Sequence, residues 1–285
     1  MRFGSKACAV IVLVAGPAQT PCADCRSSGL PPTLVAETHN GSVRMTPEIK
    51  AQLAPHGVLR AAINMSNFLL VTGRSANGDP EGVSPGMARI IAEALGVPVQ
   101  YVQYAKPGEL ADDAGKDLWD IGNIGAEPAR AEKIAFTAAY AEIEATYMVP
   151  PGSALTTIAD VDKPGVRIAV SARSAYDLWL ERNIRHATVE RANGLDGALS
   201  LFLGGGFDAL AGLRPGLLSD VQKMPGAVIL PGQFTAVQQA VGTAKGNTAA
   251  AAWLHTFVEE AKASGQVAKF IAEHKVNGLS VAPPG

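Results

Sequence analysis

The chain has 285 residues, of which 47% are hydrophobic and 18% are charged, and its formal net charge at pH 7 is −2. A chain of this length can bury a sizeable core in one or two domains. The charge balance excludes the basic excess with which nucleic-acid-binding proteins neutralise phosphates, and no polybasic patch is present for anionic lipid. The composition therefore indicates a globular protein without a nucleic-acid partner.

The first 18 residues have the pattern of a signal peptide. Arg2 and Lys6 supply positive charge, residues 7–15 are apolar, and residues 16–18 (Gly-Pro-Ala) offer small side chains to a signal peptidase. The apolar run is shorter than the roughly 20 residues that span a bilayer, and an uncleaved anchor is the alternative. We expect cleavage and export to the periplasm.

All three cysteines precede residue 26, and Cys22 and Cys25 have the spacing of a redox or zinc half-site. No second pair completes a metal site, which favours a local disulfide or no role for this pair. The five histidines are scattered along the chain and form no metal-binding motif. We expect neither a metal ion nor a cofactor.

Residues 19–56 are predicted to be a flexible lead-in followed by a short helix. Thr46, Pro47 and Glu48 have the order of an N-cap, a proline at the first helical position and an acid in the first turn. The helix is expected to continue to about Leu53.

Strand and helix signals alternate from residue 58. The predicted elements are a strand over 58–65, a helix over 85–95 that stops at Gly96, and strands over 97–101 and 119–124. This βαβαβ order indicates an α/β protein with a parallel sheet and right-handed crossovers.

A second unit of the same kind begins near residue 150. Its predicted elements are a strand over 166–170, a helix through 176–180, strands over 208–212 and 227–230, an extended piece over 235–243, and helices over 249–263 and around 267–271. We expect lobe 1 to comprise residues 57–147 with 238–276, and lobe 2 residues 148–237. Two such lobes place a cleft between them, where α/β proteins bind ligands.

The strand predicted over 119–124 ends in glycines and turns through Pro128 to Arg130. Glycines let the backbone approach a ligand, a helix start presents free N–H groups, and a guanidinium can hold a carboxylate with two hydrogen bonds. An ordinary turn with a solvated arginine is the alternative. The combination predicts an anion-binding cradle.

Six segments together resemble a known family, namely residues 58–64, 82–96, 119–120, 130–140, 167–177 and 207–209. In this order and spacing the chain resembles extracytoplasmic solute-binding proteins of ABC importers, of the amino-acid-binding type (bacterial solute-binding protein family 3), over roughly residues 47–274. The resemblance implies the two-lobed periplasmic-binding-protein fold of type II. Residues 147–149 and 237–240 would then lie in two hinge strands.

The resemblance also assigns roles to residues. Arg130, ahead of the segment from Ala135 to Tyr140, would hold the α-carboxylate of the ligand. The other implied ligand-binding residues are Gly122, Asn123 and Gly125 at the strand end, Arg173, Ser174 and Ala175 in a turn of the second lobe, and Asn64 and Asn67 after the first strand. The implied partners are a small solute with a carboxylate and an inner-membrane ABC permease. We expect a monomer.

Leu213 departs from the family pattern, because the family usually has an aspartate there that holds the ammonium of the ligand. A buried ammonium without a partner would cost several kcal/mol. Either the ligand has no amine, or another carboxylate holds it, for which the candidates are Glu127, Glu142 and Glu144.

Arg214 follows this position and is a further candidate ligand-binding residue. Together with Arg130 and Arg173 it would suit a ligand with two anionic groups, and surface solvation of Arg173 and Arg214 is the alternative. The sequence does not name the solute.

An enzyme on the same scaffold is the competing function, since some relatives are periplasmic dehydratases, and Glu127 or Glu144 would be its acid. A nucleophilic Ser84 is not expected, because Pro85 has no N–H to donate to an oxyanion. A sensory module would need a transmembrane or signalling segment, and we see none after residue 275. We therefore expect a binding protein for transport rather than an enzyme.

Overall fold

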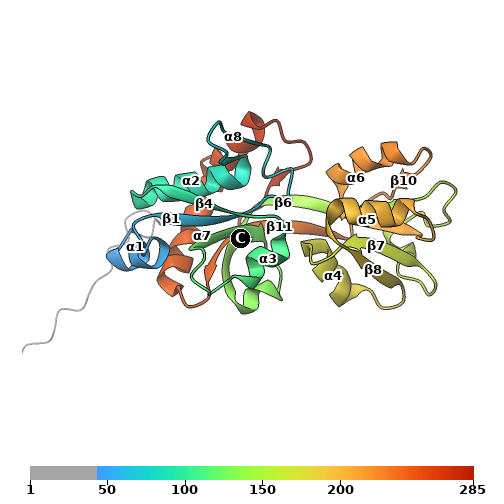
Figure 1. Cartoon of the computed structure of the whole chain (residues 1–285), viewed down its shortest axis with the longest axis horizontal. Helices are drawn as coiled ribbons and strands as arrows, with labels where there is room; N and C mark the ends of the chain where they lie inside the picture. The colour runs from blue at the N-terminus through green and yellow to red at the C-terminus, as the bar shows by residue number, and fades with distance from the viewer. Residues whose placement is uncertain (1–43) are drawn as a thin grey trace, which may run out of the picture. The chain divides into compact units, whose positions relative to one another are not determined.

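The computed structural model describes residues 44–285 (Figure 1). The predicted signal peptide and the pair Cys22 and Cys25 lie outside the described residues. Within the described part, no helix combines the length and the apolar character needed to cross a membrane. Helix α1 (Pro47–Leu53) begins where predicted, with the Thr46 hydroxyl accepting a hydrogen bond from the backbone N–H of Ile49 at 3.3 Å.

The first lobe has the predicted parallel strands. Its elements in chain order are β1 (Leu59–Asn64), β2 (Gly73–Arg74), β3 (Pro80–Glu81), α2 (Val83–Leu95), β4 (Val99–Tyr104), α3 (Pro107–Asp112) and β5 (Ile121–Gly125). Strand β1 lies between β4 and β5 and pairs in parallel with both. The carboxyl ends of β1 and β5 therefore bring Asn64 and Gly125 to the same edge of the sheet.

The second lobe repeats this arrangement. Its elements are η2 (Ile158–Asp160), β7 (Arg167–Ser171), α4 (Ala175–Asn183), β8 (Thr188–Ala192), α5 (Gly194–Leu203), β9 (Ala209–Leu213), α6 (Arg214–Asp220), η3 (Val221–Lys223) and β10 (Val228–Ile229). Strand β7 pairs in parallel with β8 and β9. The sequence patterns do not predict β8 and α6, because β8 lacks buried residues and α6 has only seven residues and begins Arg-Pro-Gly.

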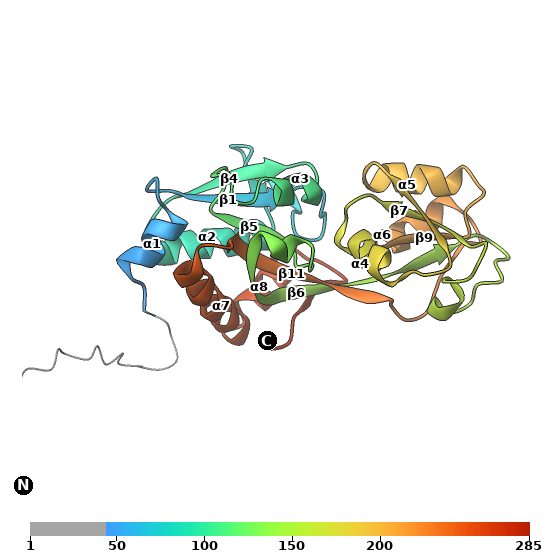
Figure 2. The same cartoon turned by 90° about the horizontal axis from the view of Figure 1, so that it is seen from below.

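Two long strands connect the lobes, β6 (Ile134–Val149) and β11 (Thr235–Ala244), which pair antiparallel (Figure 2). Strand β11 also pairs with β5 of the first lobe, and β6 pairs with β9 of the second. The predicted hinge residues 147–149 and 237–240 lie within these two strands. The register between them shifts on both sides of Ala240, so the pair is irregular at this point.

The chain returns to the first lobe in its last elements, α7 (Thr248–Ala263), α8 (Gln266–Glu273) and β12 (Ser280–Val281), the last of which pairs with β6. Leu254 of α7 and Phe270 of α8 are buried in the same core as Leu59 and Met87. Ser84 is buried beside this core, where its hydroxyl shares a hydrogen bond of 2.7 Å with the hydroxyl of Tyr140.

Each lobe fixes its strand register with an aspartate at the start of a central strand. Asp120, just before β5, accepts a hydrogen bond of 2.8 Å from the backbone N–H of Arg60 in β1. Asp208, just before β9, accepts one of 2.8 Å from the backbone N–H of Arg167 in β7. These bonds align the amino ends of neighbouring strands, and β5 begins at Ile121 instead of at Trp119 as predicted.

Candidate functional site

Arg130 lies at the start of the short helical turn η1 (Arg130–Glu132), which is the next element after β5, and the residue is only 5% exposed. Its Nη1 donates a hydrogen bond of 2.7 Å to the carbonyl of Gly125 at the end of β5. Its Nη2 donates one of 3.0 Å to the carbonyl of Arg173 in the second lobe. The guanidinium therefore contacts both lobes.

The charge of Arg130 is buried beside neutral acceptors. Within the described residues, both hydrogen bonds of its side chain go to carbonyl oxygens rather than to a carboxylate. Burial lowers the pKa of Arg130 to about 10, while the charge of Glu127 acts to raise it and that of Arg173 to lower it. At neutral pH the guanidinium stays protonated, and an anionic ligand would supply the partner that this buried cation lacks.

A cavity of about 60 Å³, called the Arg130 cavity below, lies against this guanidinium. Residues of both lobes and of β11 line it: Asn64, Ser66, Asn67, Pro107, Gly125 and Arg130 from the first lobe, Ser171, Ser174, Ala175, Tyr176, Leu195 and Leu213 from the second, and Val237 and Gln239 from β11. The structure thus brings six of the ten predicted site residues together, namely Asn64, Asn67, Gly125, Arg130, Ser174 and Ala175.

Helix α4 begins at this cavity. Ser174 is its N-cap and accepts a hydrogen bond of 3.1 Å from the backbone N–H of Asp177. Ser174, Ala175 and Tyr176 all line the cavity. The first N–H groups of a helix have no partner within the helix, and the helix dipole is positive at this end. The start of α4 and the guanidinium of Arg130 therefore both favour an anion in the cavity.

Gly122 and Asn123, which were predicted at the strand end, lie deeper in the first lobe. A Cβ atom added to Gly122 would come within 3.1 Å of Leu110 and 3.4 Å of Trp119, so this glycine packs against the core. Asn123 is 1% exposed, and neither polar atom of its side chain has a hydrogen-bond partner in the described part of the chain. Neither residue lines the Arg130 cavity.

Arg173 and Arg214 also lie outside this cavity, so the expected cluster of three arginines does not form. Arg173 has a left-handed backbone (φ 59°), and its guanidinium reaches the Asp112 carboxylate of α3 at 2.6 and 2.8 Å. Arg214 begins α6 and donates from Nε to Glu144 of β6 at 2.5 Å. It lines a different cavity of about 680 Å³. Both side chains are therefore already paired with carboxylates.

The carboxylates considered as partners for a ligand amine lie elsewhere too. Glu127 is 8% exposed and accepts a hydrogen bond of 2.5 Å from Arg182. Glu142 and Glu144 line the cavity that contains Arg214. Among the residues that line the Arg130 cavity there is no carboxylate, whereas Leu213 is one of them. Leu213, where the resemblance implies an aspartate, thus faces the Arg130 cavity with an apolar side chain.

Sequence reasoning missed seven lining residues: Ser66, Pro107, Ser171, Tyr176, Leu195, Val237 and Gln239. Ser171 is the last residue of β7. Because α/β proteins bind ligands at the carboxyl ends of parallel strands, Ser171 could have been predicted in the same way as Asn64. Leu195 follows the unpredicted strand β8, and Gln239 lies beside the irregular register of β6 and β11. No local sequence signal marks these two positions.

Within residues 44–285, the His, Cys, Asp and Glu side chains form no group of three that could hold a metal ion.

Comparison with known families gives a match over most of the chain. The family model of the bacterial extracellular solute-binding proteins, family 3, matches residues 63–276. Among curated proteins, none matches the chain.

Solved structures are similar to the chain in fold. Holo ArgBP from T. maritima is 20% identical with a TM-score of 0.59, over 74% of this chain and 93% of that one. A putative binding component of an ABC transporter from Wolinella succinogenes, complexed with lysine, is 19% identical with a TM-score of 0.64, over 76% and 95%. The ancestral amino acid-binding protein AncCDT-1, a precursor of cyclohexadienyl dehydratase, is 20% identical with a TM-score of 0.64, over 80% and 99%. These likenesses confirm the predicted fold class.

Proposed function

The chain belongs to the bacterial extracellular solute-binding proteins, family 3, and from this premise we propose that it binds a small carboxylate-bearing solute between its two lobes. The solute is an amino acid or a related organic acid. The protein works in the periplasm and delivers the solute to an ABC permease of the inner membrane. The similar structure that is complexed with lysine supports this class of solute.

The buried charge of Arg130 is the observation that carries the proposal. A protonated guanidinium that is 5% exposed and bonded only to carbonyls lies against a cavity at the start of helix α4. A carboxylate in this cavity would accept hydrogen bonds from Arg130 and from the free N–H groups of α4. In a site closed to water such charge-assisted bonds are stronger than in solution.

Contacts between the lobes support the proposal that binding is coupled to closure of the lobes. Arg130 bonds to the carbonyl of Arg173, Arg173 pairs with Asp112, and Arg182 pairs with Glu127. Each of these contacts joins the two lobes. Closure of the lobes dehydrates the solute and strengthens its contact with Arg130, and the closed form is the shape that a permease recognises.

Isothermal titration calorimetry with a panel of amino acids and organic acids tests the proposal. For the solute that binds, Arg130→Ala should remove detectable binding, because a bidentate charged contact in a closed cleft contributes roughly 2–5 kcal/mol. Arg130→Lys should also weaken binding, since an ammonium cannot reproduce the planar fork. Arg89→Ala is the control, because Arg89 is exposed on α2 and pairs there with Glu93. Equal affinity of the wild type and Arg130→Ala would contradict the proposal.

The same samples separate binding from catalysis. After incubation with the protein, the solute should be recovered unchanged in its NMR spectrum. Consumption of the solute would instead identify an enzyme on this scaffold.

A further inference from the structure

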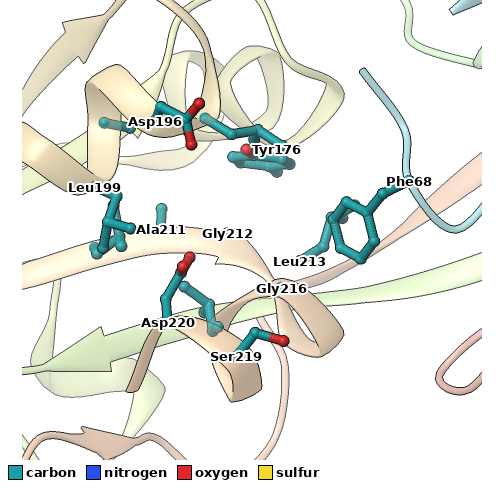
Figure 3. A pocket seen from close by; sticks show the side chains of 14 residues that line it. Phe68, Tyr176, Asp196, Leu199, Ala211, Gly212, Leu213, Gly216, Ser219 and Asp220 are labelled. Carbon is teal, nitrogen blue, oxygen red and sulfur yellow. The ribbon is translucent and has the colours of Figure 1, made fainter. Parts of the chain in front are cut away.

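Another cavity, of about 260 Å³, adjoins the Arg130 cavity and is larger than it. Figure 3 shows the side chains that line this larger cavity. Tyr176, Leu195 and Leu213 line both cavities, so the two spaces share a wall. The larger one lies in the second lobe at the carboxyl end of β9, between helices α5 and α6. Phe68 of the first lobe closes one side of it, near Leu213 in Figure 3.

The wall of this larger cavity is mainly apolar. Leu195, Leu199 and Leu217 of α5 and α6 and Ala211 of β9 contribute to it. Phe68 is 42% exposed and Leu195 is 40% exposed, although both are large apolar side chains next to the cavity. Apolar surface of this kind, gathered around one concave space, is stabilised by an apolar occupant. A cavity of roughly 150 Å³ is enough for a benzene ring, so this one has room for an aryl group or a short hydrocarbon chain.

Negative charge lies at the rim of the cavity. Asp196 of α5 and Asp220 of α6 come from opposite sides and both line the space (Figure 3). Asp220 also pairs with Lys223 at 3.0 Å, whereas Asp196 is exposed. A second carboxylate on a ligand would approach these two aspartates and be repelled. The two cavities therefore differ in the sign of the charge that lines them, with Arg130 in the smaller cavity and the aspartates in the larger one.

We infer that the larger cavity is a subsite for the apolar body of the ligand whose carboxylate Arg130 holds. We name it the apolar subsite, defined by Phe68, Tyr176, Leu195, Leu199, Leu213 and Gly216. The ligand class is a monocarboxylate with an alkyl or aryl body and no α-ammonium, since Leu213 stands at the junction of the two cavities. This inference rests on the proposed function, because it takes the carboxylate at Arg130 as given.

Matched pairs of acids test the inference by calorimetry on the full protein. Propionate and pentanoate differ by two methylenes, and pentanoate should bind roughly tenfold or more tightly because each buried methylene adds about fourfold. Pentanoate and glutarate differ by a terminal carboxylate, and glutarate should bind more weakly. The last pair is 3-phenylpropionate and L-phenylalanine, which differ by the α-ammonium, and L-phenylalanine should bind more weakly.

Two leucines of helix α5 provide a matched pair of variants. Leu195 lines the apolar subsite and is 40% exposed, whereas Leu203 does not line it and is 38% exposed. Leu195→Asn should lower the ratio of the affinities for 3-phenylpropionate and propionate by roughly fivefold or more. Leu203→Asn should leave this ratio unchanged. Equal effects of the two variants would overturn the inference.

A variant that fills the subsite gives an independent measurement. Gly216 lies in α6, and a Cβ atom added there would be 3.4 Å from the Phe68 ring, which is ordinary contact. Gly216→Leu should fill part of the subsite and weaken 3-phenylpropionate far more than propionate. Unchanged affinity for 3-phenylpropionate in this variant would also overturn the inference.

The outcomes distinguish the subsite from the proposed function. If glutarate or L-phenylalanine binds more tightly than its partner, and Arg130→Ala removes that binding, the proposed function holds and the apolar subsite is wrong. If no apolar monocarboxylate binds, the subsite is wrong whatever other solute binds. If binding survives Arg130→Ala, the proposed function itself is wrong.

Discussion

Arg130 of the first lobe donates a hydrogen bond of 3.0 Å to the backbone carbonyl of Arg173 in the second lobe. The side chain of Arg173 in turn reaches the first lobe, where its guanidinium contacts Asp112 and the carbonyl of Gly108. Arg130 and the contact between the lobes are therefore joined through one residue. A ligand bound to Arg130, as proposed, would also stabilise the turn that holds the lobes together.

The pair of Arg173 and Asp112 should add modestly to ligand affinity. Asp112→Ala is expected to weaken binding by up to about fivefold, because both side chains are 55% exposed and exposed pairs contribute roughly 0–1 kcal/mol. The loss should shrink at high salt, which screens exposed charges. Calorimetry at low and high salt measures both effects.

Glu109→Ala is the control for this pair, since Glu109 lies on the same helix and pairs with Lys106 within the first lobe.

The Arg173 guanidinium lowers the pKa of Asp112 below its usual value of 3.8. The pair should therefore persist at all pH values above this range and be lost only as the pH falls through the lowered pKa. An effect of Asp112→Ala that varies with pH near neutrality would contradict this assignment.

Leu213→Asp should convert the site into one that accepts an α-amino acid. Leu213 lines the cavity against Arg130, and an aspartate there would place a carboxylate where the family pattern has one. We expect tighter binding of L-phenylalanine and weaker binding of 3-phenylpropionate than in the wild type, because the new charge attracts an ammonium. Titration of both compounds measures the change in preference.

Leu213→Asn separates charge from size in that experiment. It has nearly the shape of aspartate but no charge, so it should not improve L-phenylalanine binding. Equal gains with Asp and Asn would show that polarity alone, rather than an ammonium partner, decides the preference.

The pH dependence of binding should follow Arg130. Its pKa is lowered from 12.5 to about 10 in the folded protein. In the ligand-free protein, Arg130 therefore keeps its proton to higher pH in the unfolded chain than in the folded chain. The free energy of unfolding accordingly increases as the pH rises through about 10. A bound carboxylate favours the protonated form, so its affinity is greatest below that pH and falls above it.

Thermal unfolding with and without ligand checks this sign. The ligand-induced rise in Tm should be constant between about pH 6 and 9 and decline above about pH 10. A decline that begins near neutral pH would assign the anion contact to a group other than Arg130.

Short sequence patterns predicted the helix ends correctly where a few neighbouring residues determine them. The Thr46 cap and the glycine stop at Gly96 each depend on a few neighbouring residues, and both are where the sequence predicted them. The alternation of strand and helix patterns in the sequence predicted the parallel pairing of strands. These patterns arise because each strand and helix must bury an apolar face against another element. Strand β8 was missed because all its residues are partly or fully exposed and carry no such signal.

The site was predictable only where it follows the strand ends. Asn64 and Gly125 lie at carboxyl ends of parallel strands, and Arg130 begins the next element after one of these strands. The directions of Arg173 and Arg214 depend instead on a left-handed turn and on the start of a short helix. Their partners, Asp112 and Glu144, are distant in sequence, so no local pattern reveals that both arginines are already paired.

Asp120 should be far more important for stability than its neighbour Asp117, although both contact Arg60. The Asp120 side chain is 3% exposed and accepts hydrogen bonds from the backbone N–H, Nε and Nη2 of Arg60 at 2.8, 3.2 and 2.7 Å. The Asp117 side chain is 71% exposed. Loss of buried, charge-assisted bonds leaves donors without partners, whereas loss of an exposed pair costs little.

We therefore expect Asp120→Asn to lower the free energy of unfolding by about 2–4 kcal/mol. Asp117→Asn should lower it by less than about 1 kcal/mol. Asparagine suits both positions because it keeps the side-chain shape, and at Asp117 it also tolerates the left-handed backbone with φ 57°. Urea unfolding followed by circular dichroism measures the two values. Similar losses for both variants would mean that the buried bonds of the Asp120 side chain do not fix the pairing of β1 with β5, where they add to the backbone bond of 2.9 Å from the N–H of Asp120 to the carbonyl of Arg60.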